Sequence, residues 1–260
     1  GRSGDALPDN IRRILQQSDR LITEVAMPSK PDAAYSRDVA AMRGRAFQNG
    51  GRKLSSVIGA ENVAALKKRL SAYPATAASA AGLDDMTPWG ALMLQASVKP
   101  QGFQTASGID RLLARAVEQY HIPADSLERY QDITRPYETL PTARIAELIA
   151  ANNRHPEQTA AQIERQYALY HSGRLKELIR LSSDSSEYSK GLPPQSTAFW
   201  QNWLEESVLL PRNRAWLPKI LNELPKRRNL IAVGIARLPD ENGLIMQLRR
   251  QGYTVEPVAE

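Results

Sequence analysis

The chain has 260 residues, of which 42% are hydrophobic and 24% charged, with a formal net charge of +6 and no cysteine. This length and composition predict one soluble folded unit with a sizeable core, and the lack of cysteine excludes disulfides and thiolate chemistry. No uninterrupted apolar run approaches the roughly 18 residues of a membrane span, so we expect no transmembrane segment. The basic residues are dispersed and lack interleaved aromatic residues. This pattern favours an ordinary solvated surface over a nucleic-acid-binding surface.

The first predicted elements are a short helix and a strand. Asp9 is suited to cap a helix that turns Ile11, Ile14 and Leu15 toward the core, and residues 21–25 form a β-rich run. Residues 26–56 are polar, basic and weakly periodic, which predicts a loop or a pair of short helices.

The middle of the chain is predicted to be helical. The spacing of apolar residues and the helix-breaking residues predict helices over 60–73, 143–152, 156–170 and 175–181. Two more helices are predicted, one with Thr87 as its N-cap and Pro88 at its first position, and one that begins at Gly108. Residues 75–82 are predicted to be a small-residue linker or a helix start, and residues 182–194 a polar loop. Phe199, Trp200 and Trp203 then form a stripe. A core-facing stripe is favoured over an exposed binding patch.

The last segment has the pattern of a strand-loop-helix-strand unit. A long helix is expected to begin at Arg212 and Asn213, followed by a β-rich run from Asn229 to Gly234, an amphipathic helix and a second β-rich run from Tyr253. Open α/β sheets bind ligands at the carboxyl ends of their strands. The loop over residues 234–237 is therefore where we expect chemistry.

These elements predict an α/β fold with α+β-like character. We expect a central mixed β-sheet built from the terminal segments and a large helical middle lobe. Residues 1–260 would form a single domain, with a sheet-containing lobe over 1–56 plus 205–260 and a mainly helical lobe over 57–204.

Short motifs along nearly the whole chain occur in a recognisable order. They are Leu7-Pro8, Glu24 on the early strand, Pro88-Trp89, Gly108-Ile109-Asp110, Tyr170-x-x-Gly173, Arg212-Asn213, Gly234, Leu238-Pro239 and Gly243-Leu244. This order resembles the TraB/PrgY/GumN family, which includes the TIKI-type metalloproteases. The resemblance also implies a strand that ends at Leu127-Glu128, although the residues before it are not β-rich.

The resemblance implies a metal-dependent catalytic centre. In the family it is built from two Gly-x-x-His motifs, an acidic residue on an early strand and the arginine of the Arg-Asn motif. Glu24 and Arg212 match the last two as catalytic residues. The later histidine position holds Arg237, and the earlier one falls on Gly4.

The lost histidines change the chemistry that we expect. A catalytic metal needs imidazole, thiolate or carboxylate donors, whereas a guanidinium stays protonated and only donates hydrogen bonds. The three histidines, His121, His155 and His171, lack the spacing of a metal pair. We therefore expect no metal or other cofactor, with Glu24 as the ligand should a divalent ion such as Mn, Co or Zn bind.

The leading hypothesis is a catalytically degenerate member of this family. It would bind a peptide, a protein partner or a small anionic ligand in a remnant active-site cleft, through Arg237, Asn213, Gly234 and Asp240. The alternatives are a metal-dependent hydrolase or peptidase that uses carboxylate ligands and a basic structural or nucleic-acid-associated protein. The location is predicted to be periplasmic or secreted if an N-terminal signal was removed, and cytoplasmic otherwise; the oligomeric state stays open.

Overall fold

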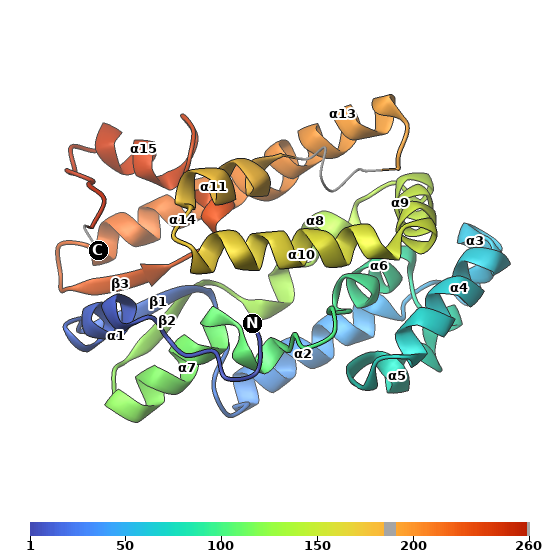
Figure 1. The fold of residues 1–260 in the computed structure, drawn as a ribbon, viewed down its shortest axis with the longest axis horizontal. Coiled ribbons are helices and arrows are strands. Elements are labelled where there is room, and N and C mark those ends of the chain that lie inside the picture. Colours follow the sequence, from blue (N-terminus) through green and yellow to red (C-terminus); the bar gives the residue numbers. More distant parts are fainter. Residues whose placement is uncertain (185–190, 259–260) are drawn as a thin grey trace.

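A parallel three-stranded sheet lies at one end of the molecule. The computed structural model describes residues 1–184 and 191–258, and its strands are β1 (Arg20–Val25), β2 (Ala124–Glu128) and β3 (Asn229–Ala232), in the order β2-β1-β3 (Figure 1). Leu21 of β1 lies opposite Ala124 on one side and Leu230 on the other. Since all three strands point the same way, their carboxyl ends meet at one edge.

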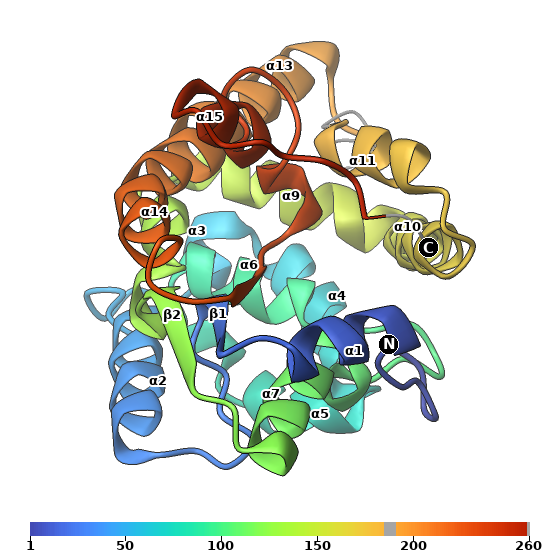
Figure 2. The ribbon, with the colours of Figure 1, turned by 90° about the vertical axis from the view of Figure 1, so that its left-hand side faces the viewer.

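Helices cover both faces of the sheet because the buried residues of β1 alternate. Leu21 packs in a cluster with α1 (Asp9–Gln16) and α7 (Ile109–Tyr120), whereas Ile22 packs in another with α14 (Leu210–Glu223) and α15 (Leu244–Arg250). Successive side chains of a strand point to opposite faces, so two adjacent apolar residues suffice to anchor both layers. Figure 2 shows α1 and α7 on one side of the strands and α14 and α15 on the other.

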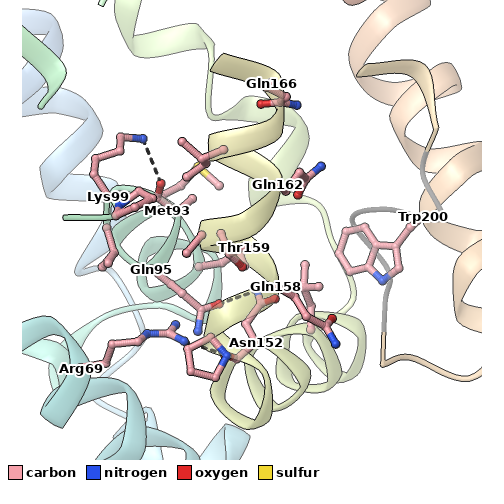
Figure 3. Close-up of a pocket in the computed structure, with 18 of the residues that line it drawn as sticks. Arg69, Met93, Gln95, Lys99, Asn152, Gln158, Thr159, Gln162, Gln166 and Trp200 are labelled. Atoms are coloured by element: carbon pink, nitrogen blue, oxygen red, sulfur yellow. Dashed lines mark hydrogen bonds between the residues drawn. The ribbon is translucent and has the colours of Figure 1, made fainter. Parts of the chain in front are cut away.

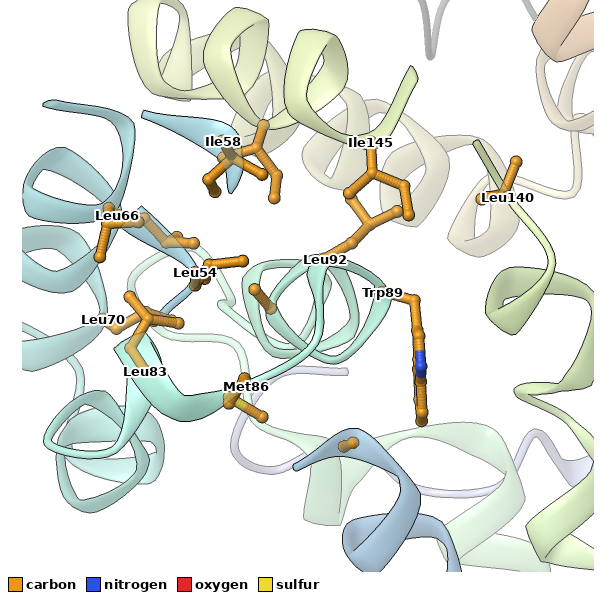
Figure 4. Close-up of a cluster of buried hydrophobic side chains, with 14 of the residues drawn as sticks. Leu54, Ile58, Leu66, Leu70, Leu83, Met86, Trp89, Leu92, Leu140 and Ile145 are labelled. Atoms are coloured by element: carbon orange, nitrogen blue, oxygen red, sulfur yellow. The ribbon is translucent and has the colours of Figure 1, made fainter. Parts of the chain in front are cut away.

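The rest of the chain forms a helical part with its own core. Its α-helices are α2 (Ala33–Ala46), α3 (Ser55–Ile58), α4 (Ala60–Ser71), α5 (Pro74–Ala80), α6 (Pro88–Ala96), α8 (Arg135–Glu138), α9 (Thr142–Arg154), α10 (Pro156–His171), α11 (Leu175–Ser183) and α13 (Pro194–Trp203). The largest hydrophobic cluster among the described residues surrounds α6 and includes Leu92 and Trp89 of α6, Leu66 of α4 and Ile145 of α9 (Figure 4). In the described residues no helix combines the length and apolar character needed to cross a membrane.

Short 3₁₀ turns and one π-helical segment connect these elements. The 3₁₀ turns are η1 (Leu83–Asp85), η2 (Thr105–Ser107), η3 (Tyr130–Asp132) and η5 (Ile235–Arg237). The segment η4 (Leu204–Leu209) is a π-helix that joins α13 directly to α14, so both run as one continuous helical rod. A π-helical turn is rare and widens the helix by one residue.

Most predicted elements are confirmed. The α/β fold with a large helical part is present, and Thr87 caps α6 by accepting a hydrogen bond from the Gly90 N–H at 3.1 Å, with Pro88 at the first position. The three consecutive helices after residue 142 form as expected. Trp200 is buried, and Phe199 and Trp203 pack partly buried against the helical core, which confirms the core-facing stripe.

Three expectations need correction. The described sheet is parallel rather than mixed, and it takes β2 from the middle of the chain. Residues 33–46 form one long helix, which Asp32 caps by accepting from the Tyr35 N–H. The long helix starts at Leu210, two residues earlier than predicted. Of the two alternatives for residues 75–82, the helix start is confirmed, because α5 begins at Pro74.

The second C-terminal strand does not form in the described residues. Residues 253–258 have no regular structure, and Tyr253 and Val258 are exposed. Pairing there would bury little apolar surface, and Pro257 lacks the N–H that a strand donates. Of the polar loop predicted for 182–194, residues 185–190 lie outside the described residues, while Ser182 and Ser183 end α11 and Pro194 begins α13.

Candidate functional site

Two glutamates lie at the carboxyl edge of the sheet. Glu24 is the penultimate residue of β1, and Glu128 ends β2 opposite Val25. Their side chains are mostly buried, with 24% and 14% of the surface of Glu24 and Glu128 exposed. The parallel register therefore places two carboxylates side by side at the edge where α/β proteins bind ligands.

Arg212 joins the two carboxylates from the first turn of α14. Its Nη2 donates to Glu24 Oε2 at 2.8 Å, its Nε donates to Glu128 Oε2 at 3.1 Å, and its Nη2 also contacts Glu128 Oε1. A planar guanidinium suits this arrangement because its donors diverge in a fixed fork. One arginine thus balances part of the charge of both acids.

The loop after β3 approaches Glu24 from the opposite side. The Gly234 N–H donates to Glu24 Oε1 at 2.7 Å, and Arg237 Nε lies 3.8 Å from the same oxygen. A Cβ atom at residue 234 would lie 3.1 Å from Glu24 Oε1, so the close approach depends on glycine. Both oxygens of Glu24 are therefore committed to protein donors.

Arg237 is the most deeply buried charge of the site. Only 4% of its surface is exposed, and its Nη1 donates to the carbonyls of Val208 at 2.7 Å and Leu209 at 3.2 Å. These carbonyls belong to the π-helical segment η4. Burial, together with the charge of Arg212, lowers the pKa of Arg237 to about 10, against the opposing charges of Glu24 and Glu128.

Two neighbours hold the arginines in place. Asn213 Nδ2 donates to the Arg237 carbonyl at 3.2 Å and to the Asn242 carbonyl at 3.3 Å. The guanidinium carbons of Arg212 and Arg237 each lie 4.8 Å from the ring centre of Trp216. We call Glu24, Glu128, Arg212 and Arg237 the carboxylate–arginine cluster.

Asp110 extends the acidic side of the site. It lies in the first turn of α7 as an exposed residue, and desolvation by the surrounding protein, together with the charge of Glu24, raises the pKa of its carboxyl, while Arg111 lowers it. Sequence reasoning did not select Asp110 or Glu128 as site residues. The signals were present, because Asp110 belongs to the Gly108-Ile109-Asp110 motif and Glu128 ends a strand.

Of the other predicted ligand-binding residues, two lie within the site and one lies outside it. Asn213 and Gly234 lie within the site, whereas Asp240 is exposed in a left-handed turn with φ of 67° and joins no ion pair among the described residues. Asp240 takes part in a local turn instead, in which its backbone carbonyl accepts a hydrogen bond from the Gly243 N–H. The structure thus places Asp240 outside the cluster.

The site residues do not fit a divalent metal. In residues 1–184 and 191–258 no three His, Cys, Asp or Glu side chains are grouped so that they could hold one. Arg237, which the resemblance places at an expected histidine position, offers hydrogen-bond donors only. His155 and His171 lie near Glu157 at 3.4 Å and Asp5 at 4.0 Å, and His121 ends α7.

A cleft of about 360 Å³ opens beside Glu128 at this edge of the sheet. Its wall includes Asp38 and Arg129, which form an ion pair at 2.7 Å. Tyr35 and Tyr130 meet edge to face there, with ring centres 5.0 Å apart. The cleft therefore offers acceptors, a cation and aromatic surface next to the cluster.

The comparisons with known proteins agree with the order of the motifs. The TraB/PrgY/gumN family profile matches residues 2–257. No curated protein and no solved structure shows a significant match. Because the profile covers nearly the whole chain, this protein belongs to the TraB/PrgY/gumN family.

Proposed function

We propose that this chain binds a short peptide segment, without hydrolysing it, in the cleft beside the carboxylate–arginine cluster. The observation that carries the proposal is the commitment of the family site to internal contacts. Arg212 spans Glu24 and Glu128, and Arg237 donates to two backbone carbonyls. A dication would have to displace these donors before it reached a carboxylate.

A peptide suits the cleft better than a small anion does. The cluster contains two arginines and two glutamates, and Asp110 adds an acid nearby, so no net positive charge is left to attract an anion. A peptide carries both donors and acceptors, which Asp38, Arg129 and the tyrosine pair can match. The tyrosine rings add apolar contact area at small entropic cost.

The proposal is tested with fluorescein-labelled decapeptides of mixed sequence in EDTA. We expect saturable binding by anisotropy in the wild type and a loss of about tenfold in Tyr35→Ala, which removes a ring from the cleft wall. Tyr170→Ala, at an exposed tyrosine outside the cleft, is the matched control. Absence of saturable binding, or equal binding by both variants, contradicts the proposal.

The same peptides test for hydrolysis. They are incubated with the protein and Mn²⁺, Co²⁺ or Zn²⁺ and analysed by mass spectrometry, and we expect them to stay intact. Cleavage that disappears in Glu24→Gln would replace the binding proposal with hydrolysis.

The metal-dependent hydrolase stays the second candidate because of Asp110. A carboxyl whose pKa is raised by burial and by the charge of a neighbouring carboxylate, here Glu24, is a pattern typical of acid–base sites. This candidate requires near one equivalent of metal by elemental analysis after dialysis against trace Mn, Co and Zn. The metal would be lost in Glu24→Ala.

A further inference from the structure

A second and larger cavity lies between the helices of the helical part. It has a volume of about 560 Å³ and is bounded by α4, α6, α9, α10 and the rod of α13 and η4 (Figure 3). Ala236 also lines it, so the cavity reaches the back of the loop that carries Arg237. Small-molecule sites in proteins typically measure roughly 300–1,000 Å³, so this cavity has the size of a ligand site.

The charged side chains described in the wall of this cavity are all cationic. Arg69 and Lys99 line it, and none of the described lining residues is an aspartate or a glutamate. Arg69 donates to the Asn152 carbonyl at 2.6 Å and Lys99 to the Ala96 carbonyl at 3.5 Å, so both interact with neutral groups. Burial lowers the pKa of Arg69 and of Lys99, which shows that both cations are partly removed from water.

The remaining wall is mainly apolar. Leu92, Met93, Leu148, Ile163 and Trp200 provide the apolar surface. In the described part of the chain four side-chain nitrogens of lining residues have no hydrogen-bond partner: Nε of Arg69, Nε2 of Gln162, and Nε1 of Trp200 and Trp203. All four are covered by protein atoms, so they do not open to the cavity, and an occupant would meet an apolar wall with the two cations as its charged groups.

We infer that the cavity binds a carboxylate carried on an apolar body, such as a medium-chain fatty acid or the apolar C-terminal end of a peptide. The carboxylate pairs with Arg69, and the apolar body lies against the aliphatic and indole surface. Lys99 lies at the other side of the cavity and adds to its positive potential (Figure 3). A neutral alcohol would lack the charge that the two cations complement, and a cationic amphiphile would be repelled by them. This site is separate from the peptide cleft beside Glu128, because the two sets of lining residues share no member.

The test is isothermal titration with decanoate, decan-1-ol and decyltrimethylammonium. We expect decanoate to bind with one-to-one stoichiometry and the other two to bind at least about tenfold more weakly, as expected when a charge-assisted contact is lost. A pentapeptide of alanine and leucine with a free C-terminus, compared with its C-terminal amide, identifies the source of the carboxylate. Tighter binding of the free peptide than of decanoate assigns the site to a chain terminus, and the reverse assigns it to an acyl chain.

Variants locate the binding in the cavity. Arg69→Gln with Lys99→Gln is expected to weaken decanoate binding at least about tenfold, while Lys68→Gln, at an exposed cation next to Arg69 and outside the lining, leaves it unchanged. Ala160→Trp fills the cavity from α10 and is expected to weaken binding while both cations remain. Melting temperatures of all variants show that they are folded. Equal binding of decanoate and decanol, or unchanged binding in the double variant and in Ala160→Trp, overturns the inference.

Discussion

The guanidinium of Arg237, at the residue where the resemblance led us to expect a histidine, is part of the internal packing. It donates to the carbonyls of Val208 and Leu209 and faces Trp216. A shorter imidazole at this position would leave those carbonyls without this donor. A histidine introduced here would therefore remove a structural contact and would not simply supply a metal ligand.

Arg237→His is expected to lower the free energy of unfolding by about 2 kcal/mol, because two buried carbonyls lose a charged donor. Urea unfolding followed by circular dichroism measures the change. Arg228→His, at a largely exposed arginine, is the control and should stay close to the wild type. A fully stable Arg237→His variant would show that the guanidinium is dispensable for the fold.

Asp110 is the residue from which we predict a pH effect. Desolvation by the surrounding protein and the charge of Glu24 raise the pKa of its carboxyl above the ordinary 3.8. The folded state then holds the proton more tightly than the unfolded chain does. The stabilisation from this carboxyl is therefore complete below pH 3.8 and is lost as the pH rises through the raised pKa.

Asp110→Asn removes this titration, so the variant should gain stability relative to the wild type as the pH rises above 3.8. Urea unfolding of both proteins between about pH 3 and pH 7 spans the ordinary carboxyl range. Glu61→Gln, in the first turn of α4, controls for the loss of an acid beside a helix N-terminus. A stability difference that does not change with pH would contradict the raised pKa.

At the scale of elements, the π-helical segment η4 sets the orientation of the site. It joins α13, which carries Trp200 and Trp203, to α14, which carries Arg212 and Asn213. One residue corresponds to a rotation of about 100° along an α-helix. The extra residue of the wider turn therefore allows the tryptophans and the arginine to face their separate partners.

Deletion of Ser207 should convert this segment to an ordinary α-helix. The tryptophans of α13 and Arg212 of α14 could then no longer both face their partners. Either the tryptophans leave the helical core or Arg212 leaves Glu24 and Glu128. We expect a loss of at least about 3 kcal/mol, as for the disruption of a buried charge network. Thermal unfolding and near-UV circular dichroism measure it, and Ser207→Ala, which keeps the register, should be near neutral. A stable deletion variant would show that the π-helical turn is not required.

The elements that depend on local chemistry were predictable from the sequence. Thr87 and Pro88 start α6 as their residue types indicate, and Pro156 starts α10. The missed helix over Ala33–Ala46 had a local signal in its Asp32 cap, whereas other misses do not follow from local chemistry. The strand expected after Tyr253 would have needed burial that the fold does not provide, and the direct continuation of α13 into α14 leaves no breaker to read at Leu204.

The site was predictable only in part. The order of the motifs predicted that Glu24, Arg212 and Arg237 lie in one site, although Glu24 and Arg212 are 188 positions apart in the sequence. The role of Glu128 depends on the register of β2 against β1, which no local pattern reveals. Likewise, nothing near Arg237 in the chain indicates that its partners are the carbonyls of Val208 and Leu209, which belong to a segment 28–29 residues away.

At the scale of the whole molecule, the sheet joins segments from three distant parts of the chain. Its strands begin at residues 20, 124 and 229, and the helical core around Leu66 and Ile149 lies between them in sequence. Neither lobe is therefore a continuous stretch that can complete its own core alone. We predict that the chain unfolds as one cooperative unit, as expected for a single domain.

Leu66→Ala tests this prediction because Leu66 is fully buried in the helical core and far from the sheet in sequence. The substitution should cost about 3 kcal/mol. In one cooperative unit, native-state hydrogen exchange in low urea would speed up by a corresponding factor at the amides of β1 as well as at those of α4. Ile220→Ala in α14, which faces the sheet core, should produce the same shared loss in α4. Protection of β1 that stays unchanged in Leu66→Ala would instead mean that the two lobes open independently, and ligand binding at either cavity would then stabilise only its own lobe.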